Sequence, residues 1–268
     1  MYEFTSESVS EGHPDKISDL ISDTIANAII NGNETHRAAV ETLVTTNAVI
    51  VAGEYKRDTP IDDATVESIV RQVVKNIGYE QDGFHWANLE VVNKLHAQSA
   101  DIALGTDDFG AGDQGLMFGY ACNETPDLMP SAIYYSHKIL KRLATERRGA
   151  EEWLGPDSKS QVTMTYDSVG KPTGIKTIVC STQHSDDVST QMVRDNVEII
   201  IREELGDDYD LSQTEFLINP TGRFVIGGPD GDTGVTGRKI IVDTYGGYAP
   251  HGGGAFSGKD CTKVDRSA

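Results

Sequence analysis

Residues 253–260, Gly-Gly-Ala-Phe-Ser-Gly-Lys-Asp, have the glycine and lysine spacing with which backbone amides and an ammonium group surround a phosphate. A P-loop would continue with Ser or Thr as a magnesium ligand and would begin a helix directly after a buried strand. Here Asp260 follows the lysine, and residues 245–250 separate the glycines from the preceding apolar segment. We therefore expect phosphate binding without the P-loop NTPase fold.

Cationic side chains occur throughout this glycine-rich part of the chain, although the net charge is −19. Cations that converge need an anion between them, so as a group they favour a phosphate-bearing ligand over separate solvated side chains. The apolar and aromatic residues in residues 219–258 argue against a disordered linker. The cations are Arg223, Arg238, Lys239, Lys259, Lys263 and Arg266.

A second group of chemically capable residues lies near the amino end, in Gly-His-Pro-Asp-Lys at 12–16. His13 could steady or protonate a leaving oxygen, and Asp15 could hold a divalent cation that bridges phosphates. Taken alone, the histidine is more often structural and the aspartate more often a helix N-terminal residue. Glu41 and Glu54 flank a β segment, where a carboxylate usually faces water.

The elements that must position these residues mix helices and strands without strict alternation. A doubly wound sheet is therefore disfavoured, and an α+β sandwich is expected. Residues 98–112, which are small, polar and glycine-bearing, predict a mobile loop. Helices are predicted at 16–30, 61–77 (begun by Asp62 and Asp63, ended by Gly78), 132–147 and 188–205, and strands at 38–52, 161–166, 174–181, 216–218 and 239–243.

Composition limits the class of protein. The 268 residues are 38% hydrophobic and 24% charged, which is typical of a globular chain. The acidic balance argues against nucleic acid as a partner, because phosphate backbones select basic surfaces. Three scattered cysteines without CxxC spacing favour free thiols. The chain carries neither a signal peptide nor an apolar run near the ~20 residues of a membrane span, so we expect a cytoplasmic protein.

Four long segments, read together, closely resemble the signature segments of S-adenosylmethionine synthetases and occur in that family's order. They are residues 4–16, 110–120, 219–229 and 252–260. The resemblance implies that the sulfur of L-methionine attacks C5′ of ATP and expels triphosphate, which is then hydrolysed to pyrophosphate and phosphate. Such a leaving group needs charge compensation in the transition state.

The resemblance also implies residue roles. The catalytic residues would be His13, Lys159, Arg238 and Lys259. ATP would be bound by His13, Asp113, Asp157, Lys159, Arg223, Phe224, Asp232, Arg238, Lys239, Ala255 and Lys259. Methionine would be bound by Glu54, Gln98, Asp232 and Lys263. Asp15 and Asp265 would hold Mg²⁺, and Glu41 would help to hold K⁺.

The same family has three similar α/β domains in a pseudo-threefold arrangement, in homodimers or dimers of dimers with active sites between subunits. On that basis we expect an N-terminal domain at 1–100, a mobile gating loop at 101–112, a central domain at 113–225 and a partial C-terminal domain at 226–268 that carries the phosphate-binding glycines. A closed gating loop would exclude water from the reaction.

Three departures from the family pattern leave alternatives open. Ala100 replaces a usual proline, residues 102–110 are shorter than usual, and the sequence ends at Ala268 where the third domain should continue. The chain could therefore be an active synthetase, or a non-catalytic nucleotide-binding subunit that needs a complete partner chain. A P-loop kinase or NTPase is the weakest alternative.

Overall fold

A computed structural model describes residues 1–97, 114–149 and 151–268. Its residues form two compact units, each built from separate stretches of the chain. Unit 1 comprises Met1–His13, Gly119–Gly227 and Ile241–Pro250, and unit 2 comprises Pro14–Phe118, Gly228–Ile240 and His251–Ala268. Each unit contains a four-stranded sheet with helices, which confirms the α+β class. The domains expected from the sequence are continuous ranges, whereas each unit combines three separate stretches of the chain. The expected domain boundaries therefore stay a prediction.

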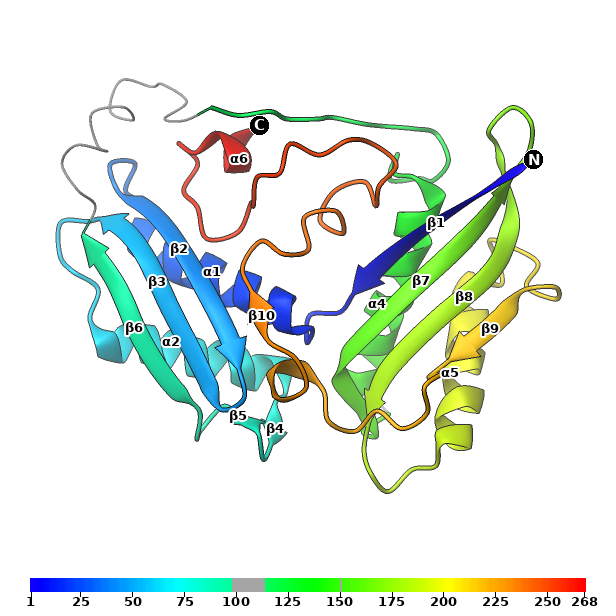
Figure 1. The fold of residues 1–268 in the computed structure, drawn as a ribbon, viewed down its shortest axis with the longest axis horizontal. Coiled ribbons are helices and arrows are strands. Elements are labelled where there is room, and N and C mark those ends of the chain that lie inside the picture. Colours follow the sequence, from blue (N-terminus) through cyan, green and yellow to red (C-terminus); the bar gives the residue numbers. More distant parts are fainter. Residues whose placement is uncertain (98–113, 150) are drawn as a thin grey trace. The chain divides into compact units, whose positions relative to one another are not determined.

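Unit 2 contains a sheet with the strand order β10-β2-β3-β6 and two helices, α1 (Pro14–Ile30) and α2 (Asp63–Ile77), that cover one face (Figure 1). Ile17, Ile21, Ile25 and Ile29 recur every four residues of α1, which places them on one side of the helix, and all are fully buried. The strands are β2 (Arg37–Thr45), β3 (Ala48–Lys56), β6 (Glu90–Ala97) and β10 (Gly234–Val235), with a small hairpin of β4 (Glu80–Gln81) and β5 (Phe84–His85).

The ends of α2 confirm the prediction made from its capping residues. The Asp62 side chain accepts a hydrogen bond from the Thr65 amide at 2.7 Å, and Gly78 has a φ of 99° in the left-handed region. Both groups satisfy backbone atoms that have no partner inside the helix.

Unit 1 contains the sheet β1-β7-β8-β9, with α4 (Ser131–Arg148) and α5 (Thr190–Leu205) packed on one face (Figure 1). The predicted hairpin is present and longer than expected, as β7 (Leu154–Tyr166) and β8 (Pro172–His184). β9 (Glu215–Ile218) pairs in parallel with β8. The first residues of the chain form β1 (Tyr2–Val9), antiparallel to β7 from Tyr2↔Tyr166 to Val9↔Lys159.

The strand predicted at 239–243 is wrong, because these residues lie in consecutive turns. The chain passes from unit 2 to unit 1 between Ile240 and Ile241. Gly246, with a φ of 62°, then donates to the Ile241 carbonyl at 3.0 Å and closes a turn. The apolar run is therefore overridden by turn-forming glycine. A 3-10 turn at Gly228–Asp230 and a short helix α6 (Val264–Ser267) complete the glycine-rich tail.

No helix within the described part of the chain combines the length and apolar character needed to cross a bilayer.

Replacing Ser189 with alanine should destabilise unit 1 by about 1 kcal/mol. Ser189 caps α5 by accepting a hydrogen bond from the Met192 amide at 3.1 Å, and alanine would leave that amide without this acceptor. Urea denaturation would measure the change. The control is Ser168→Ala in the exposed β7–β8 turn, which should lie within about 0.5 kcal/mol of the parent chain. Equal stability of both variants would contradict the capping role.

Candidate functional site in unit 2

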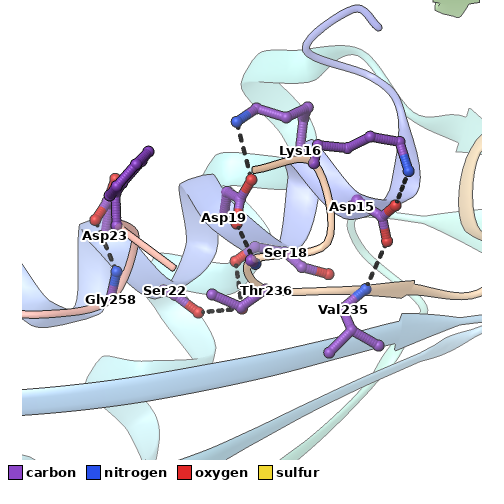
Figure 2. Close-up of polar contacts among 12 residues, drawn as sticks. Asp15, Lys16, Ser18, Asp19, Ser22, Asp23, Val235, Thr236 and Gly258 are labelled. Atoms are coloured by element: carbon purple, nitrogen blue, oxygen red, sulfur yellow. Dashed lines mark hydrogen bonds and ion pairs between the residues drawn. The ribbon is translucent and has the colours of Figure 1, made fainter. Parts of the chain in front are cut away.

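Asp15 is the centre of a polar cluster at the start of α1 (Figure 2). Its carboxylate is 2% exposed and accepts a hydrogen bond from the Val235 amide at 2.9 Å. The Lys239 ammonium group forms an ion pair with its other oxygen, and Arg238 Nε lies 3.8 Å from Asp15 Oδ1. A buried carboxylate is stable when it is paired and hydrogen-bonded in this way.

The backbone of β10 reaches Asp15 because glycine precedes Val235. A Cβ on Gly234 would lie 2.2 Å from the Pro14 carbonyl, so only glycine permits this approach to α1. Val235 is held from its other side by pairing with Leu43 of β2. The position of the Asp15 carboxylate is thus set by a helix and a strand far apart in sequence.

One face of α1 contacts the returning glycine-rich chain at three further points and β2 at one (Figure 2). Asp19 accepts from the Gly237 amide at 2.8 Å, and Asp23 accepts from the Gly258 amide at 2.8 Å. Ser22 lies 2.7 Å from the Thr236 hydroxyl and 2.8 Å from that of Thr42. Sequence reasoning missed Asp19, Ser22 and Asp23. The four-residue spacing of Asp15, Asp19 and Asp23, which places the three carboxylates along one side of the helix, is the signal that could have identified the two missed aspartates.

Residues 258–260 add to the edge of β2. The Val40 amide donates to the Gly258 carbonyl at 2.8 Å, and the Asp260 amide donates to the Ala38 carbonyl at 3.1 Å. Lys259, between them, forms an ion pair with Asp265 at 2.7 Å. Of the predicted phosphate-binding glycines, Gly258 is therefore fixed to the sheet beside an isolated β-bridge between Ala39 and Lys259.

Asp260 anchors the same segment. Burial acts to raise the pKa of its carboxyl, but hydrogen bonds from Lys263, Thr262 and the Ala38 amide outweigh burial and hold that pKa below its usual value. Lys263 Nζ lies 2.7 Å from Asp260 Oδ2. The residue that breaks the P-loop pattern thus has a structural role here.

All six cations named from the sequence have an aspartate partner. Beyond the pairs of Arg238, Lys239, Lys259 and Lys263, Arg266 lies 3.3 Å from Asp23, and in unit 1 Arg223 pairs with the exposed Asp186. The expected counter-anions are in this structure the chain's own carboxylates. A phosphate ligand would therefore have to replace these aspartates as the partner of the cations, because the positive charges are already neutralised.

Glu41 lies beside Lys259 and two further carboxylates. Burial raises the pKa of Glu41, Lys259 acts to lower it, and the negative charges of Asp19 and Glu54 raise it further. Glu54 lies on β3, and the Nε2 atom of His96, on the neighbouring strand β6, is 3.6 Å from the Glu54 carboxylate. The remaining predicted residues of unit 2 are Asp232, exposed after the 3-10 turn, and Ala255, whose methyl group would lie only 2.3 Å from a Cβ on Gly237.

Unit 1 holds the other described candidates. His13 is buried, and its amide donates to the Ser10 carbonyl at 3.1 Å. Asp157 and Lys159 lie on β7, where Asp157 is buried and Lys159 exposed. Arg223 and Phe224 follow β9. Gln98, Asp113 and the predicted gating loop lie outside the described residues.

The oxygen donors of unit 2 fit the metals that the resemblance implies. Among the described residues no group of three or more His, Cys, Asp or Glu side chains is placed to hold a metal. Mg²⁺ is commonly held by one or two carboxylates together with substrate phosphates, which suits Asp15 and Asp265. The excess negative charge around Glu41 suits a monovalent cation.

If Glu41 helps to hold K⁺, as the resemblance implies, potassium should stabilise unit 2. Since the folded pKa of Glu41 lies above its ordinary value of 4.5, its contribution to stability is complete below pH 4.5 and is lost as the pH rises through the folded pKa. A bound cation would restore part of that loss at neutral pH. Urea denaturation at pH 7 in KCl, against tetramethylammonium chloride at equal ionic strength, should show higher stability in KCl. Glu41→Gln should abolish the difference; an unchanged difference would contradict the prediction.

Comparison with known proteins gives one family along the whole chain. Profiles of the S-adenosylmethionine synthetase N-terminal, central and C-terminal domains match residues 1–100, 108–224 and 226–268. An S-adenosylmethionine synthase of Paramagnetospirillum magneticum is 59% identical over 99% of this chain and 70% of its own length. That of Maricaulis maris is 57% identical over 100% and 70%, and one from a Bradyrhizobium species 57% over 100% and 71%.

Proposed function

The chain belongs to the S-adenosylmethionine synthetase family, and we propose that it is a methionine adenosyltransferase that joins ATP and L-methionine into S-adenosylmethionine. The triphosphate that leaves is hydrolysed to pyrophosphate and phosphate. The observation that carries the proposal is the pair of aspartate–lysine contacts in unit 2, Asp15–Lys239 and Lys259–Asp265, beside the glycine-rich segment. Such groups suit a magnesium-bound polyphosphate leaving group.

The aspartates would have two successive partners. Asp15 and Asp265 would hold Mg²⁺, which neutralises charge on the triphosphate when bound. Because a carboxylate bound to a metal is less available to an ammonium group, Lys239 and Lys259 would then be free to bind phosphate oxygens. Arg238 would add charge on the same leaving group. The lysine side chains that bind the triphosphate would thus be held in position by ion pairs with aspartates until the nucleotide binds.

The remaining roles rest on the resemblance and on local geometry. His13, buried, would stabilise charge that develops on O5′ of the departing triphosphate. Asp113, Asp157, Lys159, Arg223, Phe224, Asp232 and Ala255 would contact ATP, Glu54, Gln98, Asp232 and Lys263 would contact methionine, and Glu41 would help to hold K⁺. A homodimer or a dimer of dimers with active sites between subunits, and a cytoplasmic location, are part of the same proposal. Three free cysteines support a reducing compartment.

The direct test incubates the purified chain with ATP, methionine, Mg²⁺ and K⁺ and identifies products by mass spectrometry and phosphate assays. We expect the sulfonium product together with pyrophosphate and phosphate. If the purified, folded chain forms no sulfonium product at any chain concentration, the proposal is overturned. Activity only in a mixture with a full-length relative would assign the chain as a nucleotide-binding subunit. Light scattering of the same sample would give the number of subunits.

A further inference from the structure

Within unit 1, the β7–β8 pairing is interrupted beside two of the proposed ATP contacts. Leu154 lies opposite His184 and Ser158 lies opposite Thr182, so residues 155–157 face the single residue Gln183. Such a bulge bends the strand and removes regular ladder partners from its backbone amides. It also re-aims side chains, and Asp157 is the last residue of the bulge.

The Gln183 side chain bridges this bulge to a second segment. Its Oε1 accepts a hydrogen bond from the Asp157 amide at 3.3 Å, while its Nε2 donates to the Val225 carbonyl at 2.9 Å. One carboxamide therefore connects the strand that carries Asp157 and Lys159 with the segment that carries Arg223 and Phe224. The side chain is buried, so its two hydrogen bonds face little competition from water.

Two glycines hold the carboxamide in place. A Cβ on Gly155 would lie 2.5 Å from Gln183 Cγ, and a Cβ on Gly227 would lie 2.7 Å from its Cδ and Oε1. The side chain thus passes between two backbone segments that only glycine brings so close. Confinement on both sides restricts the rotamer and fixes where the amide group points.

The residues on either side of Gln183 fasten the same two segments. Ser158 Oγ lies 2.7 Å from Thr182 Oγ1. The Phe224 amide donates to His184 Nε2 at 3.0 Å, so that nitrogen must be an acceptor, and His184 Nδ1 must then donate to the Ser185 carbonyl at 2.8 Å. The carboxyl end of β8 is therefore built to hold the backbone of both segments, and Gln183 is the residue that joins them directly.

We propose that Gln183 is a positioning residue for nucleotide binding: its carboxamide sets the spacing between Asp157–Lys159 and Arg223–Phe224. This inference rests on the proposed function, since it takes those residues as ATP contacts. Gln183 acts through the backbone and need not touch the nucleotide. Loss of the bridge should weaken ATP binding and leave methionine binding unaffected.

Gln183→Met tests the bridge, because methionine has a similar length without the amide. We expect the KM for ATP to rise about tenfold, as two buried hydrogen bonds are lost, with the KM for methionine and the kcat within about twofold of the parent. Gln183→Glu keeps an acceptor for the Asp157 amide but places a buried carboxylate against the Val225 carbonyl, so it should raise the KM for ATP at least as much as Gln183→Met. The control Gln191→Met removes an exposed amide that contacts Asp195 within α5 and should leave every constant unchanged.

Calorimetric titration with a non-hydrolysable ATP analogue and Mg²⁺ separates this inference from the proposed function. A parent chain that binds the analogue but makes no sulfonium product would overturn the proposed function, while the dissociation constants of the variants would still decide the role of Gln183. If the parent is active and both Gln183→Met and Gln183→Glu keep the parent's constants for ATP, the role of Gln183 alone is overturned. Equal rises in the KM of both substrates would also overturn it, since a general loss of structure affects both. A parent that binds no analogue would overturn both.

Discussion

Asp15→Asn should reduce the rate of S-adenosylmethionine formation by about 10²–10³-fold while the chain stays folded. The asparagine oxygen can still accept from the Val235 amide, so the contact between α1 and β10 is retained. What is lost is the negative charge that pairs with Lys239 and lies 3.8 Å from Arg238. The same charge is the proposed magnesium ligand. The loss therefore falls on stabilisation of the leaving triphosphate and not on the fold.

Initial rates at several Mg²⁺ concentrations would measure this effect, with thermal denaturation as the check on folding. The control is Asp63→Asn, which removes an acidic residue from the first turn of α2, where Asp63 accepts from the Asn93 amide group. Its rate should stay within about twofold of the parent, since the local electrostatic effect of one helix-terminal charge is small. An Asp15→Asn rate within threefold of the parent would show that this carboxylate does not act on the leaving group.

Gly258→Ala should destabilise unit 2 by about 2–4 kcal/mol and release residues 258–260 from β2. Gly258 has a φ of 77°, where a side chain is strained, and a Cβ there would lie 2.0 Å from the Val40 carbonyl oxygen and 3.0 Å from Ser22 Cβ. The neighbouring backbone cannot move aside without breaking the pairing of Val40 with Gly258. Because Lys259 follows directly, synthetase activity should fall together with the stability.

Hydrogen exchange of the Val40 amide, which donates to the Gly258 carbonyl at 2.8 Å, reports this release directly. The control is Gly32→Ala, at a φ of 73° with no atom within 4 Å of the added Cβ. It carries the backbone strain without the collision and should cost about 1 kcal/mol. Equal losses in the two variants, with Val40 still protected, would mean that the close approach to β2 has no energetic role.

Much of unit 2 could be predicted from local patterns. The four-residue recurrence of isoleucine in α1 and the Asp62 and Gly78 ends of α2 are short-range signals, because helix periodicity and capping depend on neighbours within one or two turns. The β7–β8 hairpin was predictable for the same reason, since its turn glycine lies between two β-type runs. β1 carried no comparable signal. Its polar residues form a strand because β7 supplies the hydrogen-bond partners, and β7 is more than 140 residues away.

The strand wrongly predicted at 239–243 shows the limit of local propensity. Lys239–Asp243 has a strand-like composition, but Ile240–Asp243 fold into turns where the chain passes from one compact unit to the other. The pairing of Gly258–Asp260 with β2 shows the reverse case. A glycine-rich segment forms an isolated β-bridge with β2, because Val40 and Ala38 offer it hydrogen-bond partners.

Residue types and their spacing were enough to indicate the chemistry available to this protein. The informative features were a glycine-rich segment with a lysine, a histidine and an aspartate near the start of the first helix, and the long family segments that contain them. The contacts that hold these groups in position are visible in the tertiary structure alone. It paired Lys239 with Asp15 and Lys259 with Asp265, and it placed Gln183 between Asp157 and Val225. The physical reason is range. Residue types and spacings act over a few positions, whereas an ion pair or a buried hydrogen bond depends on which distant backbone segments the folded core brings within about 3 Å.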